Sequence, residues 1–273
     1  LDEPPDIRQS YLEMKARQLA DDALAEIWGR NGLPRRWKVP WARWARMTMH
    51  RRIQVQSVVS SVALGTVDGR SVIVSGGWHG TLRVWDLATG TACGEPLRGH
   101  DGSVLSVALG TLDGRSVIVS GGYDGTLRVW DLATGTACGK PLRGHDGSVL
   151  SVALGALDGR SVIVSGGRDG TLRVWDLATG AARGEPLRGH DHGVRSVALG
   201  ALDGRSVIVS GDGDGTLRVW NSNGVLVSSV QTGSVINQLA YAPPGTFAVG
   251  TTQGLLLLQF ESKATMRPAA QWV

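Results

Sequence analysis

Residues 120–135 read SGGYDGTLRVWDLATG, and residues 165–180 repeat this string with one change, as SGGRDGTLRVWDLATG. A Gly-His pair precedes each copy, so that His145, Ser165 and Asp169 fall within 25 residues of one another. These are the residue types of a hydrolase triad. The same side chains could instead hold a fold together, and the rest of the chain decides between the two interpretations.

The string belongs to a repeat with a period of 45 residues. The Gly-His pairs end at 100, 145 and 190, and the tryptophans of the repeated strings stand at 85, 130, 175 and 220. Units 101–145 and 146–190 differ at only five of their 45 positions. Such near-identity indicates recent duplication of one stable module.

Each unit contains three clear strand-like runs and a weaker fourth. In the second unit the runs are 103–109, 115–120 and 126–130, with the weaker one near 136–142. They are rich in Val, Ile, Leu and Thr, and are separated by Gly- and Asp-containing turn sequences. Four short strands in each unit of this length are typical of β-propeller blades. The sequence therefore predicts an all-β fold, a β-propeller of four-stranded antiparallel blades.

The recurring Gly-His pairs and Asp-Gly-Thr-Leu-Arg-Val-Trp-Asp strings resemble the WD40 repeat, over residues 53–260. The resemblance implies that His, Ser, Asp and Trp of each blade form a structural hydrogen-bonded chain. The implied sets are His100, Ser120, Asp124 and Trp130; His145, Ser165, Asp169 and Trp175; and His190, Ser210, Asp214 and Trp220. A catalytic triad is normally built once, beside one pocket. Three copies at fixed spacing favour a scaffold, and we expect no catalytic residues and no enzyme activity.

The first unit departs from this pattern. Val55 stands at the histidine position and His79 at the aspartate position, so only Ser75 and Trp85 remain. We expect this blade to be the least rigid of the first four.

Five blades are expected, near 56–98, 101–143, 146–188, 191–230 and 234–260. Five are fewer than the seven typical of WD40 proteins, so the chain could form a small ring, an open arc or part of a larger propeller. We expect residues 46–54 to close the ring as the outer strand of the fifth blade. An open propeller would expose a sheet edge, and strand exchange between chains would then be an alternative to a monomer.

The ends of the chain have a different composition. Apolar residues at helical spacing predict a helix over 7–28 within an N-terminal segment, 1–32, and residues 261–273 form a C-terminal tail. The linker 33–52 interleaves Trp37, Trp41 and Trp44 with basic residues. These tryptophans could pack against a blade. Alternatively, the linker could bind an anionic membrane surface, an acidic partner or nucleic acid. Nucleic acid is disfavoured because residues 53–273 carry as many acidic as basic side chains.

Two short motifs permit other interpretations, which we set aside. GDGDG at 211–215 is similar to a phosphate or calcium loop, but it stands between two strands and aligns with the repeated turn. His190 and His192 could bind a metal, but no third ligand is evident. No metal site and no cofactor are therefore expected. Cys93 and Cys138 occupy one repeat position, and we expect two free thiols in a cytoplasmic protein. The excess of Arg over Lys is typical of GC-rich bacterial genomes.

Function is expected to reside where the repeats vary. The turn between the second and third strands places Trp78, Tyr123, Arg168 and Gly213 at one equivalent position. Trp, Tyr and Arg are enriched at interface hot spots, and neutral drift at an exposed turn is the alternative. We expect a non-enzymatic scaffold for a protein or peptide partner. The chain could also be the detached sensor or regulatory region of a larger bacterial signalling NTPase or kinase.

Overall fold

The computed structural model describes residues 53, 55, 57–243 and 245–259. The chain divides into two compact units, Leu1–Arg52 and Ile53–Val273, and the structure described below belongs to the second. The expected helix over 7–28, the linker 33–52 and the tail 261–273 lie outside the described residues. Of the expected closing strand 46–54, only Ile53 is described, and it is not part of a strand.

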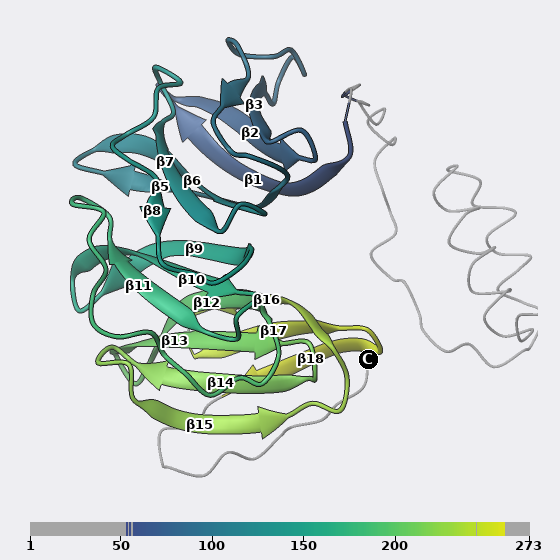
Figure 1. The fold of residues 1–273 in the computed structure, drawn as a ribbon, viewed down its shortest axis with the longest axis vertical. Helices are drawn as coiled ribbons and strands as arrows, with labels where there is room; N and C mark the ends of the chain where they lie inside the picture. Colours follow the sequence, from purple (N-terminus) through teal and green to yellow (C-terminus); the bar gives the residue numbers. More distant parts are fainter. Residues whose placement is uncertain (1–52, 54, 56, 244, 260–273) are drawn as a thin grey trace, which may run out of the picture. The chain divides into compact units, whose positions relative to one another are not determined.

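The described residues form five antiparallel sheets, one after another along the chain (Figure 1). The first contains β1 (Val59–Val67), β2 (Arg70–Gly77), β3 (Thr81–Asp86) and β4 (Leu97–Arg98). The second contains β5 (Val104–Leu112), β6 (Arg115–Gly122), β7 (Thr126–Asp131) and β8 (Leu142–Arg143). The third contains β9 (Val149–Leu157), β10 (Arg160–Gly167) and β11 (Leu172–Asp176). The fourth contains β12 (Val194–Leu202), β13 (Arg205–Asp212), β14 (Thr216–Asn221) and β15 (Leu226–Gln231). The fifth contains β16 (Ile236–Ala242), β17 (Thr246–Thr251) and β18 (Gly254–Gln259).

This arrangement confirms the all-β, antiparallel expectation, and the sheets are consistent with propeller blades. Tight Asp-Gly turns join the first two strands in each of the first four sheets. In the second sheet Asp113 and Gly114 have φ of 50° and 77°. Positive φ at both central residues is what a two-residue hairpin turn with the favoured twist requires, and Asp-Gly supplies it at low steric cost.

In the first three sheets the fourth strand is short, unlike the six-residue β15 of the fourth sheet. β4 and β8 contain two residues each, and in the third sheet the equivalent strand is reduced to an isolated bridge between Leu172 and Leu187. A proline (Pro96, Pro141 and Pro186) stands directly before each of these pairing positions. Because proline has no N–H to give to a ladder, it interrupts the pairing: isolated bridges at Ala92, Ala137 and Ala182 precede it, and pairing resumes directly after it.

Neighbouring sheets pack face to face through their first strands, β1 with β5, β5 with β9, β9 with β12, and β12 with β16. At the first junction Val104 and Val107 of β5 lie over Gly76 of β2, where an added Cβ would come within 2.6 Å of the Val104 side chain. Glycine is needed here because a side chain would occupy the space of these valines. The same contact recurs at the following junctions, at Gly121, Gly166 and Gly211. The hydrophobic core therefore lies between sheets.

Candidate functional site

The second and third sheets bring together the side chains expected to bond to one another. In the third sheet the Nδ1 atom of His145 lies 3.1 Å from Asp169, and its Nε2 atom lies 2.8 Å from the Ser165 hydroxyl. The Trp175 indole N–H donates to the same hydroxyl at 3.0 Å. The second sheet repeats these distances to within 0.1 Å, with His100, Ser120, Asp124 and Trp130. The loop before the first strand is thereby tied to the second and third strands.

The protonation of these groups follows from burial and from their hydrogen bonds. Desolvation lowers the pKa of His145, and the attraction of Asp169 only partly opposes that shift. Burial by itself would raise the pKa of Asp169, but the amides of Asp146 and Thr171 donate to its carboxylate and lower the pKa below the usual value. A neutral imidazole therefore donates from Nδ1 to a carboxylate and accepts from the Ser165 hydroxyl at Nε2.

This geometry resembles a triad but lacks a reachable nucleophile. Ser120, Ser165 and Ser210 have no exposed surface. A hydroxyl that accepts from an indole and donates to an imidazole, inside a closed sheet, cannot approach a substrate. The arrangement bridges strands, as buried polar groups do when each finds its partner.

The fourth sheet uses a different aspartate from the one expected, and the expectation for Asp214 was wrong. The Nδ1 atom of His190 lies 2.7 Å from the Asp212 carboxylate, which has no exposed surface. Asp214 instead accepts from the amide and hydroxyl of Thr216. Ser210 keeps its place, bonding to His190 at 2.7 Å and to the Trp220 indole at 2.9 Å.

The change of aspartate is caused by the residue directly before the variable turn position, Gly213. Asp212 occupies the place of Gly167, where an added Cβ would overlap His145 Nδ1 and the Asp169 carboxylate. A side chain at this position therefore takes the space in which the second aspartate meets the imidazole. Burial, and the neighbouring Asp214 carboxyl, raise the pKa of Asp212, whereas the pKa of Asp214 is lowered by its hydrogen bonds to Asp212 and Thr216. The sequence signal was the first aspartate of GDGDG, Asp212, at a position where the other repeats have glycine.

The first sheet retains one bond of the network, from the Trp85 indole to the Ser75 hydroxyl at 2.8 Å. A cavity of about 30 Å³ is lined by Val55, Ser75 and Thr81, among others. The imidazole that bonds to the equivalent serine in the second, third and fourth sheets is missing because position 55 is a valine.

The four variable turn residues lie along one continuous rim. Trp78 and Tyr123 are 62% and 60% exposed, and Arg168 is also exposed. The loops carrying the histidines alternate with the turns: the Ser103 hydroxyl donates to the Trp78 carbonyl, and the Tyr123 amide donates to the Ser103 carbonyl. Ser148 makes the same pair of bonds to Tyr123 and Arg168. Gly213 continues the rim beside His192. It is half-buried and contributes no side chain to the surface.

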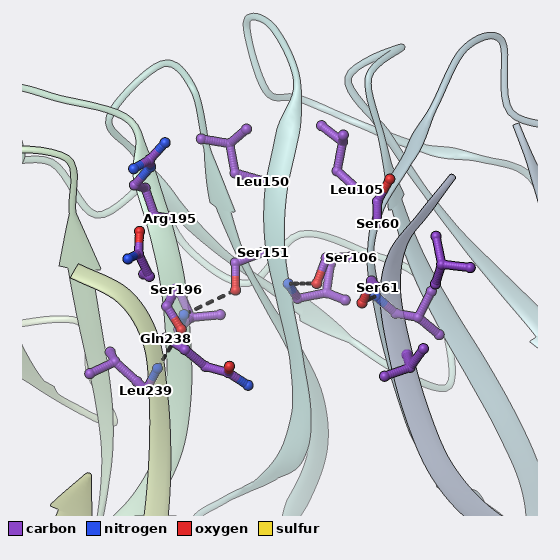
Figure 2. A pocket seen from close by; sticks show the side chains of 16 residues that line it. Ser60, Ser61, Leu105, Ser106, Leu150, Ser151, Arg195, Ser196, Gln238 and Leu239 are labelled. Atoms are coloured by element: carbon purple, nitrogen blue, oxygen red, sulfur yellow. Dashed lines mark hydrogen bonds between the residues drawn. The ribbon is translucent and has the colours of Figure 1, made fainter. Parts of the chain in front are cut away.

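A central cavity of about 520 Å³ is lined by the first strands of all five sheets (Figure 2). Serine hydroxyls link the first strands of neighbouring sheets, since each accepts a hydrogen bond from a backbone N–H of the next sheet's first strand at 2.8–3.0 Å. The serines are Ser61, Ser106, Ser151 and Ser196. Sequence reasoning missed them, although one polar residue at the same place in four apolar strands was a usable signal.

Leu105, Leu150 and Arg195 lie at one level of this cavity, above the linking serines in Figure 2. This end adjoins the rim, because a Cβ added at Gly193 would meet both the Leu150 side chain and the Arg168 backbone. The lining includes Arg195, Asn237 and Gln238 and no carboxylate. The cavity wall therefore offers hydrogen-bond donors and one positive charge, with two leucines at the end beside the rim.

The remaining chemistry is sparse. Cys93 and Cys138 are exposed free thiols. Within the described part of the chain, no three His, Cys, Asp or Glu side chains gather in a way that suits a metal ion. Across the same residues, no helix has the length and hydrophobicity needed to span a bilayer.

Comparison with known proteins agrees with the repeat pattern. A search of curated proteins gives no match. A family model described as WD domain, G-beta repeat matches residues 49–86, 91–131, 136–176 and 184–221, which together cover more than half of the chain. The sheets, their spacing and this match agree, and the chain belongs to the WD40 repeat family.

Proposed function

We propose that this chain is a non-enzymatic scaffold that holds a protein or peptide partner on the rim formed by Trp78, Tyr123 and Arg168. WD40 repeats generally mediate protein–protein interaction, and this family membership supports the class of function. The observation that carries the choice of surface is the exposure of two large aromatic side chains, 62% for Trp78 and 60% for Tyr123, at turns of otherwise near-identical repeats.

The rim is suited to binding because hydrogen bonds hold its backbone in place while its side chains are exposed to solvent. The hydrogen bonds of Ser103 and Ser148 fix neighbouring turns and loops against one another. An exposed aromatic on a fixed backbone loses little conformational entropy when a partner covers it. The cavity end beside Arg168 adds two leucines and the Arg195 guanidinium to the same face.

The test begins with the full chain as bait, followed by cross-linking and mass spectrometry to identify a partner that is then purified. Converting Trp78, Tyr123 and Arg168 together to alanine should weaken the affinity for that partner at least tenfold, or about 1.4 kcal/mol. The melting temperature should stay nearly unchanged because these side chains are exposed.

A matched control exists at the other end of the same strands. Arg70, Arg115 and Arg160 begin β2, β6 and β10 and are exposed, and their triple alanine variant should bind as the unmodified chain does. Undiminished binding by the rim variant, or equal loss in the control, would contradict the proposed surface.

A further inference from the structure

The first sheet has an apolar face that no other described sheet covers. Val59, Val62 and Leu64 of β1 are 40%, 61% and 70% exposed. The residues one repeat later behave differently: Val104 is fully buried and Val107 is 7% exposed. The third and fourth sheets bury their equivalents in the same way, at Val149, Val152, Val194 and Val197. We call Val59, Val62 and Leu64 the leading face.

The fifth sheet has the opposite kind of uncovered face. Leu255 and Leu257 of β18 are 61% and 55% exposed, whereas Leu217 and Val219, at the same places in the fourth sheet, are fully buried. Beside them Gly250 takes the place of Gly211. A Cβ at Gly211 would collide with Ile236 of the next sheet, but a Cβ at Gly250 would meet only Gln238 of its own sheet, at 3.7 Å. We call Gly250, Leu255 and Leu257 the trailing face.

These two faces are the two halves of a contact made four times inside the molecule. At the first three internal junctions valines of one sheet rest on the glycine, leucine and valine of the sheet before it, and at the fourth Ile236 takes the place of the valine. In the core between the first two sheets, Val104 and Val107 pack with Leu82 and Val84, beside Gly76. Any surface that covers the leading face of the first sheet must offer a similar glycine recess with apolar walls.

We infer that the leading face of the first sheet binds the trailing face of the fifth sheet in a second copy of this chain. Among the described residues, the fifth sheet has the one trailing face left uncovered by a following sheet. In a single chain β1 and β16 do not pack together as the other first strands do. The contact continues the internal junction in chemistry and shape, and being between unlike surfaces it is a head-to-tail interface. This inference does not depend on the proposed function of the rim.

Self-association of the full chain is the first test. Light scattering coupled to gel filtration should show a mass that rises from one chain to two or more as concentration increases. The double variant Val62→Asp with Leu64→Asp should shift the association midpoint at least tenfold to higher concentration. Val227→Asp provides the control, because Val227 is 60% exposed on β15 and belongs to neither face. A full chain that stays monomeric at all concentrations, or equal effects of the two variants, would overturn the inference.

Cross-linking identifies the surfaces in contact. In a background in which Cys93 and Cys138 are serine, one chain carries Val62→Cys and another carries Gly250→Cys, the pair equivalent to Val107 and Gly76. Mixing the two and oxidising them should give a disulfide-linked dimer, while either alone should give little. A third chain carries both cysteines. If the disulfide forms only within this chain, the chain closes on itself. A dimer of Val62→Cys alone would show two leading faces in contact. Either result would overturn the inference.

Discussion

In the third and fourth sheets an imidazole is held in the same way, but by carboxylates from different positions in the repeat. In the third sheet Asp169 reaches His145 from the turn, keeps 12% of its side chain exposed, and has a lowered pKa because backbone amides donate to it. In the fourth sheet Asp212 reaches His190 from the end of β13, is fully buried, and has a raised pKa. The difference shows that the repeat fixes the position of the histidine and the serine, while the source of the carboxylate can move by two residues.

Removal of the histidines should give the largest effect and should separate the two sheets. His190→Ala leaves the fully buried Asp212 with only the amides of Asp214 and Thr216 as donors and without contact with water, and breaking a buried pair typically costs about 3–5 kcal/mol. His145→Ala leaves a carboxylate that still has amide donors and contact with water, so a cost of about 1–3 kcal/mol is expected. Urea denaturation at pH 7 measures both free energies of unfolding. Equal losses would contradict the difference drawn between the two carboxylates.

Replacing each carboxylate by its amide should give a smaller effect of unequal size. Asp169 is favoured as an anion by the amides of Asp146 and Thr171, so Asp169→Asn should cost about 1–2 kcal/mol. Asp212 also accepts from two amides, but burial and the neighbouring Asp214 disfavour its charge, so Asp212→Asn should change stability by less than about 0.5 kcal/mol. The comparison uses the same denaturation experiment. A larger loss for Asp212→Asn would show that this carboxylate is needed in its charged form.

The pH dependence of stability should have opposite signs for the two kinds of group. The pKa of His100 and of His145 is lowered in the folded state, so as pH falls through 6.5 the unfolded chain takes up protons first and stability decreases. The raised pKa of Asp212 acts the other way: stability is lost as pH rises from 3.8 through the folded-state value. Relative to the unmodified chain, Asp212→Asn should remove the second dependence and leave the first. A pH profile identical to that of the unmodified chain would contradict the raised pKa.

Much of this could be predicted from repeat spacing, because near-identical units must adopt near-identical structures. The bonds of His145, Ser165 and Trp175 fall at the positions that the period indicates. The prediction for Asp214 was wrong because the repeat period takes no account of steric exclusion. The Asp212 side chain occupies the place from which the next carboxylate would reach the imidazole. The uncovered faces of the first and fifth sheets also escape prediction, since exposure there depends on which neighbour is absent and not on the local sequence.

The first sheet permits the reverse experiment, in which the missing network is built. Val55 and His79 stand where the second sheet has His100 and Asp124, and the Ser75 hydroxyl that would bond to the new imidazole is already in place beside Trp85. The paired change Val55→His with His79→Asp should stabilise the chain by about 1 kcal/mol, the net worth of a satisfied buried hydrogen bond. Urea denaturation of the pair and of each single variant gives the coupling between the two positions.

The single variants make this result specific to the bridge between the two new side chains. Val55→His alone puts an imidazole beside Ser75 with no carboxylate to receive its Nδ1–H, and an unsatisfied buried donor is unfavourable. His79→Asp alone changes an exposed turn and should have little effect. The double variant should therefore exceed the sum of the two single effects. Simple additivity would mean that the cavity of about 30 Å³ beside Val55 does not admit the ring in the orientation seen in the second sheet.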